Sequence, residues 1–579
     1  MSQRKLKKIR KEIEILKNSG SEQDISNKVA LRVTLKKIIK DNFLWLLLMT
    51  VVIIGIYFNS LWGNFVSDDY ASIPQNPYID NFWYMFGKGN SMGFSTYLMK
   101  QIVGFGSSVP FHLMAVINFI IFCWVAYIFL EIVFKDKWLT RVTMFLFALH
   151  PIHAEAVSWI SGRIYLILGL YTMIAFIGFI FFVKNNNPKY LLITLVAFIL
   201  GFLTDRPRPF VILLLIIIYL LYVGFNKIKI DWAKFTMWAV AITILFVIFA
   251  IPYIKFRIGV VNSGYNSSES IFYNPFFQYP TGISKYLQLL FFPVDLTLYH
   301  TMYTFPVWLN WIILINYFIL VVYFFFKDKR YFFALAFIVV AVLPSIMPVK
   351  VSWLVAERYI FLGSLGFCLF LALIIIGISK YKKWVAAIIF VCLVFGYGVR
   401  LFLRNIDWQT NHNLWVNTCQ MSPNSHNAWN NIGDDYDKLN DPTNAIKGFT
   451  QSTIVKPNYA DAYHNRANIF FKTGRLDLAR DSYSTALNFS PGLYQTYLSL
   501  TQIDLMENNI SLAMEHARKA VEIDPSNPQA AYVLAVVYAQ GGRAVEAEAL
   551  LSDILKKVPD YQPAVQALKQ LKMATGVTK

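Results

Sequence analysis

Charged residues and cysteines are scarce in this chain of 579 residues. Only 15% of the residues are charged and 56% are hydrophobic, which excludes an ordinary soluble protein, because such proteins carry about 25% charged residues. The four cysteines form neither a disulfide framework nor a zinc pattern, since Cys123, Cys368 and Cys392 fall inside apolar segments and Cys419 stands alone. A cleavable signal is lacking as well, because the first apolar segment follows a long charged leader and has no small-residue cleavage site. We expect that segment to stay as a signal anchor.

Acidic residues are fewer than basic ones, 34 against 53, and the formal net charge is +19. A basic balance can indicate nucleic-acid binding, so the position of the excess matters. From Leu401 onward the chain has 16 basic and 17 acidic residues, and the whole excess therefore lies before that point. This distribution leaves no basic surface for nucleic acid. We expect membrane lipids as partners instead.

Long apolar segments indicate a polytopic membrane protein, because about 20 apolar residues cross a bilayer as a helix. Segments of this length lie at 43–62, 110–134, 164–183, 235–254, 308–326, 358–378 and 384–401. Shorter ones lie at 141–159, 189–204, 209–224 and 331–347. The sequence therefore predicts about eleven transmembrane helices.

Lysine and arginine gather in alternate connections between these segments. The clusters lie at 1–41, 135–141, 184–189, 227–234, 327–330 and 380–383. Such residues are retained on the cytoplasmic side of a membrane, so we expect a cytoplasmic N-terminus and an extracytoplasmic C-terminal region. The predicted location is the plasma or inner membrane, or the endoplasmic reticulum membrane in a eukaryote.

A 34-residue repeat fills the C-terminal region. Prolines recur at 423, 457, 491, 525 and 559, and alanines recur at 445, 479, 513 and 547. This period is the tetratricopeptide signature, in which each repeat is a pair of helices. Trp429, Gly433 and Phe449 occupy positions of the first repeat that later repeats fill with similar residues. We predict four repeats and a final helix, an α-solenoid whose groove can hold an extended peptide.

These patterns together predict an all-α chain in four parts. The parts are a basic cytoplasmic leader at 1–41, a transmembrane domain at 42–404, a linker at 405–422 and a repeat domain at 423–579.

Two adjacent acids, Asp68 and Asp69, follow the first apolar segment in a stretch without Lys or Arg. A carboxylate pair at the edge of a bilayer is costly, and such groups are usually retained for a function. The predicted topology places this pair on the external side, together with the loops at 150–163 and 350–358.

Three segments together resemble one family. They are Phe65–Asp69, His150–Val157 running into Gly162–Arg163, and Ala356–Phe367. With the repeats that follow, they resemble the transmembrane, tetratricopeptide-containing O-mannosyltransferases of the C-type glycosyltransferase superfamily and their bacterial relatives. The resemblance implies transfer of a sugar, expected to be mannose, from a polyprenyl-phosphate carrier to a Ser or Thr hydroxyl outside the cytoplasm, with inversion. The repeats are then expected to recruit the acceptor protein.

The resemblance also implies roles for single residues. A hydroxyl must lose its proton as it attacks, so a general base is needed, and this role falls to Asp68 with Asp69 in support. The leaving phosphate gains negative charge, which a fixed cation stabilises. Arg163 and Arg358 are the expected phosphate ligands. A topological or lipid-facing role stays open for each of the two arginines.

His150, His153 and Glu155 are expected to support the site through hydrogen bonds to the donor or to the backbone of a short helix. A metal site is the alternative, because histidines at i and i+3 can share a helical face, although Pro151 weakens that geometry. We expect Glu357 to pair with Arg358, while a supporting functional role for it stays open, and we expect no cofactor besides the lipid-linked sugar.

One segment departs from the family pattern. Where a Lys-Glu pair followed by small residues is usual, this chain reads Thr-Asp-Arg-Pro-Arg-Pro at 204–209. Arg206 or Arg208 can still serve phosphate binding, and a different lipid-linked sugar stays open. Two other functions also stay open: a transporter or flippase with a docking domain, and a non-catalytic envelope scaffold.

Overall fold

The structure is a computed structural model that describes residues 22–87, 90–185, 187–204, 208–224, 274–303, 305–346 and 353–574. Within these ranges every regular element is a helix, as expected for an all-α chain. The chain divides into two compact units, Met1–Asn417 and Thr418–Lys579. The predicted transmembrane segment at 235–254 lies outside the described residues.

Five helices of the described first unit are long and apolar enough to cross a membrane. They are α2 (Glu22–Tyr57) continued by η1 (Phe58–Trp62), α6 (Val109–Phe134), α9 (Ile164–Asn185) preceded by η3 (Ser161–Arg163), α14 (Val307–Lys327) and α17 (Lys383–Asp407). Shorter apolar helices are α10 (Pro188–Thr204), α11 (Val211–Val223) preceded by η4 (Arg208–Phe210), and α16 (Gly363–Ser379).

Two predicted crossings differ from the structure. The segment at 141–159 is not one helix, because α7 (Lys137–Leu149) ends before His150 and the chain continues as η2 (Pro151–His153) and α8 (Ala154–Val157). A residue before proline is driven out of the helical region, and His150 is extended with φ −67° and ψ 125°. The segment at 331–347 is α15 (Lys329–Val342), which a proline-containing turn, η7 (Leu343–Ser345), follows.

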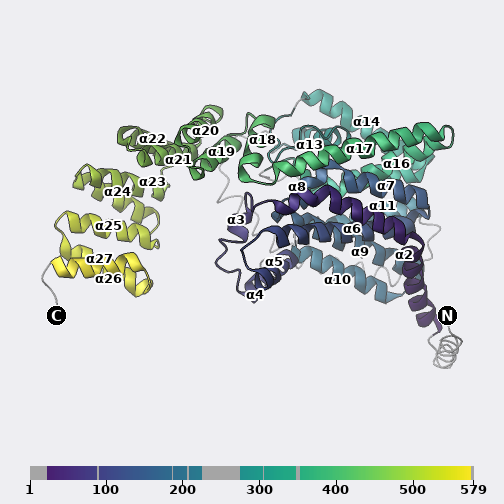
Figure 1. Cartoon of the computed structure of the whole chain (residues 1–579), viewed down its shortest axis with the longest axis horizontal. Coiled ribbons are helices and arrows are strands. Elements are labelled where there is room, and N and C mark those ends of the chain that lie inside the picture. Colours follow the sequence, from purple (N-terminus) through teal and green to yellow (C-terminus); the bar gives the residue numbers. More distant parts are fainter. Residues whose placement is uncertain are drawn as a thin grey trace. The chain divides into compact units, whose positions relative to one another are not determined.

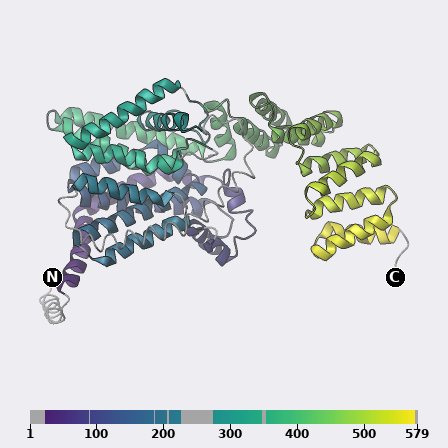
Figure 2. The ribbon, with the colours of Figure 1, turned by 180° about the vertical axis from the view of Figure 1, so that it is seen from behind.

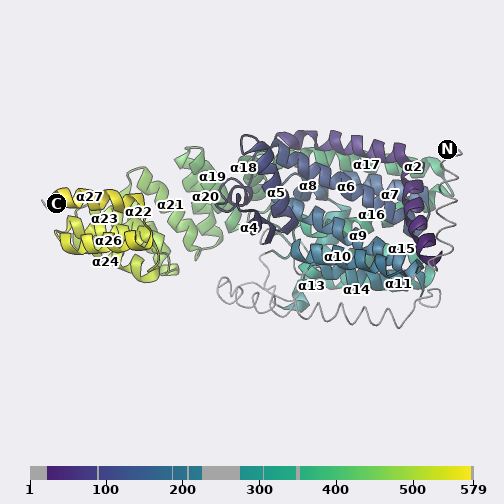
Figure 3. The ribbon, with the colours of Figure 1, turned by 90° about the horizontal axis from the view of Figure 1, so that it is seen from below.

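The long helices pack against one another as a bundle. Helices α2, α6, α9 and α10 run side by side in that order (Figure 1). The teal helices α13 (Pro275–Phe291), α14 and α15 lie on the face that Figure 2 shows. In Figure 3, α17 lies beside α2 at one side of the unit and α14 and α11 lie at the other.

The outward surface of the bundle is apolar. Phe326 on α14 is 80% exposed and Phe395 on α17 is 72% exposed. Large exposed apolar surfaces mark membrane or partner contacts. The surface of α14 and α17 therefore agrees with a location in a lipid bilayer.

Short elements gather at one end of the bundle and bring separate segments of the chain together. They are α3 (Asp69–Ser72), α4 (Phe82–Gly87), α5 (Asn90–Val103), η2, α8, η3 and η8 (Glu357–Ile360). Helix α8 contacts η2, η3 and η8, while α17 contacts both α8 and η1. The loops that follow α2 and α7, the start of α9 and the end of α17 therefore meet at this end.

The second unit is a stack of antiparallel helix pairs that α18 (Asn411–Met421) precedes along the chain. The pairs are α19 (His426–Lys438) with α20 (Pro442–Val455), α21 (Ala460–Lys472) with α22 (Leu476–Phe489), α23 (Tyr494–Met506) with α24 (Ile510–Ile523), and α25 (Pro528–Gln540) with α26 (Ala544–Lys557). Helix α27 (Gln562–Ala574) follows. The predicted four repeats and final helix are thus present, and the periodic alanines are fully buried.

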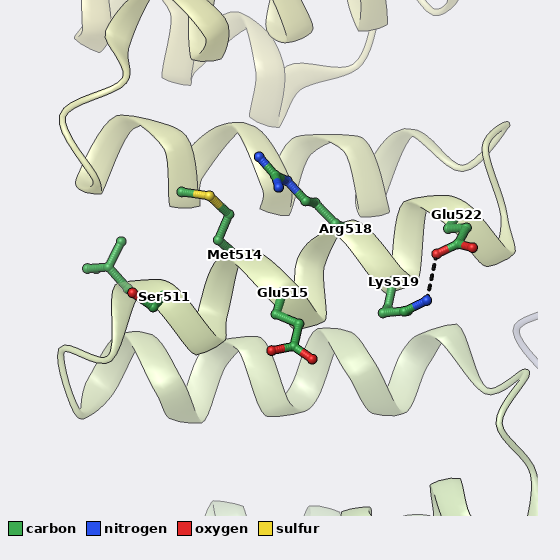
Figure 4. A pocket seen from close by; sticks show the side chains of 7 residues that line it. Ser511, Met514, Glu515, Arg518, Lys519 and Glu522 are labelled. Carbon is green, nitrogen blue, oxygen red and sulfur yellow. Dashed lines mark hydrogen bonds and ion pairs between the residues drawn. The ribbon is translucent and has the colours of Figure 1, made fainter.

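A surface pocket of about 480 Å³ runs along α24 in the second unit. Its lining side chains all come from that one helix, and Lys519 pairs with Glu522 at 2.9 Å (Figure 4). Mixed charges on one helix face are typical of a solvated surface. The pocket therefore does not define the candidate site.

Candidate active site

The two adjacent acids lie in different surroundings. Asp68 is exposed and occupies the position before the first residue of α3, whereas Asp69 is fully buried. One carboxylate oxygen of Asp69 accepts hydrogen bonds from the backbone N–H of Ser161 at 2.8 Å and from its hydroxyl at 2.5 Å. The other accepts from the backbone N–H of Val66 at 3.2 Å. Asp69 is thus held inside the protein while Asp68 stays accessible.

Burial changes the acidity of Asp69. Desolvation raises the pKa of its carboxyl from 3.8 to about 6, against the hydrogen bonds from Ser161 and Val66 and the charge of Arg163, which lower it. A group with this pKa is still partly protonated in mildly acidic solution. Asp69 is therefore suited to positioning through hydrogen bonds.

We call Asp68, Asp69 and Ser161 the acid cluster. Arg163 of η3 lies next to it. It is fully buried, and its Nη2 donates a hydrogen bond to the hydroxyl of Thr96 on α5. Its Nε and Nη1 have no hydrogen-bond partner among the described residues. Because a buried guanidinium normally has all of its donors paired, these two donors are candidates for an anionic or sugar ligand.

Arg358 forms an ion pair with Glu155, which is fully buried on α8. The backbone N–H of Arg358 donates to the second carboxylate oxygen of Glu155 at 2.7 Å. The guanidinium also lies over the rings of Trp159, at 5.3 Å, and Tyr359, at 4.9 Å. Arg358 is therefore fixed by both charge and aromatic contacts.

The expected pairing of Glu357 with Arg358 is wrong. Glu357 instead binds Arg404 of α17, with 3.0 Å between Oε1 and Nη2, and lies 3.6 Å from Nε2 of His300. Glu357 and Arg358 are consecutive residues of a 3-10 helix, where successive side chains point about 120° apart. The two neighbours therefore face different partners.

A small cavity of about 30 Å³ lies beside Arg358. Arg208, Tyr165 and Tyr359 also line it. The Arg208 guanidinium lies 4.8 Å from the ring centre of Tyr165 and 4.7 Å from that of Tyr359. We call these four residues the arginine cavity; two guanidinium groups and two phenol hydroxyls are groups that bind phosphate oxygens.

The acid cluster and the arginine cavity belong to the two ends of one short stretch of chain. Ser161, which binds Asp69, is four residues before Tyr165 of the cavity, and η3 runs directly into α9 between them. Four helical residues advance about 6 to 8 Å. Gly162 lies so close to the backbone oxygen of Glu155 that a side chain at this position would clash. Glu155, the ion-pair partner of Arg358, therefore packs against the turn from Ser161 to Tyr165.

The two predicted histidines are fully buried. His150 directly precedes η2, and His153 is its last residue. Nδ1 of His150 accepts from the backbone N–H of Ile152 at 3.3 Å, and its Nε2 lies 3.1 Å from the backbone oxygen of Leu290. Nε2 of His153 lies 2.8 Å from the hydroxyl of Ser364. His150 thus binds the backbone at the start of a short helix, which is one of the two expected roles. No group of three or more His, Cys, Asp or Glu arranged to hold a metal ion occurs in the described part of the chain.

Sequence reasoning placed Arg206 at the site, but this residue lies outside the described residues. It missed Thr96, Ser161, Tyr165 and Tyr359, which carry no signal beyond their nearness to Arg163 or Arg358 in sequence or space. Arg404 had a usable signal, because a charged residue near the end of an apolar helix is costly to bury without a function or a partner.

Both units of the chain match known proteins. Tetratricopeptide-repeat family models match residues 430–493 and 504–571. Protein O-mannosyl-transferase TMTC3 of Mus musculus is 23% identical over 86% of this chain and 66% of its own length. The Homo sapiens protein of the same name is 22% identical over 85% of this chain and 65% of its own length. The chain thus spans slightly less than two thirds of the length of these curated relatives.

Shorter matches also occur. Protein O-mannosyl-transferase TMTC1 of Homo sapiens is 33% identical over 21% of this chain and 16% of its own length. Among solved structures, the repeat protein YrrB is 17% identical over 34% of this chain and 97% of its own, with a TM-score of 0.25. MamA is 19% identical over 25% of this chain and 80% of its own, with a TM-score of 0.24.

The relatives that match across both units share one description, and the repeat models match the C-terminal unit. These matches make the chain similar, across both units, to the transmembrane, tetratricopeptide-repeat-containing protein O-mannosyl-transferases.

Proposed function

We propose that the chain transfers mannose from a polyprenyl-phosphate carrier to a Ser or Thr hydroxyl of a protein on the external side of the membrane. The observation that carries this proposal is the arrangement of the acid pair, of which Asp69 binds Ser161, and of the arginine cavity at the two ends of the single turn from Ser161 to Tyr165. A nucleophile-activating base and a phosphate site must lie within one sugar's reach for such a transfer. The relatives named as protein O-mannosyl-transferases support the reaction class.

Asp68 is the proposed general base, because its carboxylate is exposed while that of Asp69 is occupied by Ser161 and Val66. The acceptor oxygen attacks the anomeric carbon and forms the new C–O bond while its proton moves to Asp68. The bond between the anomeric carbon and the phosphate oxygen breaks, and polyprenyl phosphate leaves with the electron pair. A single displacement of this kind inverts the anomeric carbon.

Arg358 and Arg208 are the proposed ligands of the leaving phosphate. Two guanidinium groups in a protein interior stabilise the growing negative charge far better than they would in water. A cavity of about 30 Å³ holds a water molecule, so a phosphate group requires Arg208 to move away from the fixed Arg358. Arg163 adds two unpaired donors on the acid side of the same turn, and we assign them to the sugar-phosphate end of the donor.

The repeat unit is the proposed acceptor-recruiting part. A stack of helix pairs presents a groove that binds extended peptides, and the repeat models match residues 430–493 and 504–571 of this unit.

The test is transfer in vitro. Purified full-length chain, reconstituted with polyprenyl-phosphate mannose and a Ser/Thr peptide, is expected to give a peptide heavier by one hexose. Asp68→Asn should lower kcat by a factor of 100 or more, because general-base catalysis contributes about 10²- to 10⁴-fold. Asp434→Asn, at an exposed ion pair in the repeat unit, is the matched control.

Transfer that survives Asp68→Asn unchanged would remove this acid from the mechanism. Movement of the sugar-lipid across vesicles without any peptide product would favour the transporter alternative over the transferase.

A further inference from the structure

The loop that carries the acid pair is fastened to a distant part of the chain. The backbone N–H of Asn64 donates to the backbone oxygen of Gln409 at 2.8 Å. The backbone N–H of Ser67 donates to the side-chain oxygen of Asn411 at 2.8 Å. Both acceptors belong to the junction between α17 and α18, residues 404–417, which we call the junction.

Ser67, the residue directly before Asp68, has a left-handed backbone with φ +52°. Residues other than glycine rarely adopt this conformation, because the Cβ atom then crowds the backbone. Such a conformation persists only where the surroundings impose it. The hydrogen bond that Ser67 donates to Asn411 acts directly on the backbone of this residue, and the next two residues are the exposed Asp68 and the buried Asp69.

The same junction also holds the segment that carries Arg358. Arg404 and Glu357 are both fully buried, and their ion pair of 3.0 Å joins α17 to η8. Nη1 of Arg404 donates to Asp407 and to Asn417, each at 2.9 Å. Trp408 stacks on Trp159 at 5.6 Å with 20° between the rings.

We propose that the junction is the positioning element of the site, and that Asn411 is a positioning residue for Asp68. By holding the backbone of Ser67 in its left-handed conformation, Asn411 turns the carboxylate of Asp68 outward towards the acceptor and that of Asp69 inward towards Ser161. The inference rests on the proposed transferase function, and it adds a residue that none of the three family-like segments contains.

The experiment is a double-mutant cycle in the full-length chain with the transfer assay described above. Glycine adopts the left-handed conformation without steric cost, so Ser67→Gly lowers the need for an external constraint. Asn411→Ala should lower kcat about tenfold, the effect of losing one ordering hydrogen bond next to the base, while the KM for the lipid donor stays the same. In the Ser67→Gly background the same substitution should lower kcat only about twofold.

Asn316→Ala is the matched control, because Asn316 is exposed on α14, outside the junction, and donates to the backbone oxygen of Ile312 in its own helix. It should keep the parental kcat. Size-exclusion profiles of all variants show whether each remains folded.

A parental kcat for Asn411→Ala would overturn the inference, and so would an equal loss in both Ser67 backgrounds, because a general role in folding would not depend on the residue at 67. If the parent chain itself transfers no sugar, the proposed function fails and this inference fails with it.

Discussion

Neighbouring residues of the site differ in chemistry because their partners come from distant parts of the chain. Sequence patterns indicated Asp68 and Asp69 as a pair, but they did not indicate that Asp69 is the buried one, whose partner Ser161 lies 92 residues away. The same holds for Glu357 and Arg358, whose partners are on α17 and α8. The residue types were therefore predictable from sequence, and their pairing was not.

The raised pKa of Asp69 predicts a pH-dependent stability. Between pH 3.8 and about 6 the folded state keeps a proton that the unfolded state has released, so the stability of the fold falls as pH rises through this window. The shift corresponds to about 3 kcal/mol at pH above 6. Asp69→Asn cannot titrate and avoids this loss. The melting temperature of the variant in detergent, minus that of the parent, should therefore increase from pH 4 to pH 7.

Taking the difference between variant and parent removes the contribution of other titrating groups and the constant cost of altering the bonds to Ser161. A difference in melting temperature that is the same at pH 4 and pH 7 would contradict the raised pKa.

Single elements were predictable where the signal is local. The repeat helices follow from a 34-residue period whose small and large residues meet within one helix pair. Gly433 illustrates this, since a Cβ at this position would lie 2.8 Å from the ring of Phe449. The crossing at 141–159 was wrong because hydropathy ignores the restriction that Pro151 places on His150.

The close crossing of α19 and α20 predicts a localised effect of substitution. Gly433→Leu should destabilise the repeat unit by about 1 to 3 kcal/mol, because the ring of Phe449 has to move. Limited proteolysis of the full-length chain should then cleave the repeat unit at a lower protease concentration. Gly492→Leu is the control, since a Cβ there meets no atom within 4 Å. Equal resistance of both variants would contradict the tight helix crossing.

At the scale of the whole molecule, length and hydropathy predicted a membrane part followed by a polar solenoid. They did not predict how segments from 64–69, 150–165, 357–360 and 404–417 meet at one end of the bundle, because such contacts join residues hundreds of positions apart. Relatives named as protein O-mannosyl-transferases match across both units. The family-like segments and the repeats taken together therefore indicated more about the chain than any one of them alone.

The division into two units predicts that sugar transfer and acceptor recruitment can be separated. A chain that ends after Ser422 keeps α18 and the junction, and we expect it to glycosylate a short Ser/Thr peptide with the parental kcat. Its KM for an extended peptide should rise about tenfold or more, because the second binding surface and its effective concentration are lost. Steady-state kinetics with both peptides measures this. An unchanged KM for the extended peptide would remove the repeats from acceptor recruitment.

Because little more than one helical turn separates Ser161 from Tyr165, the chain between them cannot change in length without moving one of these residues relative to the other. One inserted residue would rotate everything after it by about 100° and swing the tyrosine away from both guanidinium groups. A shortened chain would do the same in the opposite sense. Related proteins that share this arrangement are therefore expected to keep the spacing of four residues.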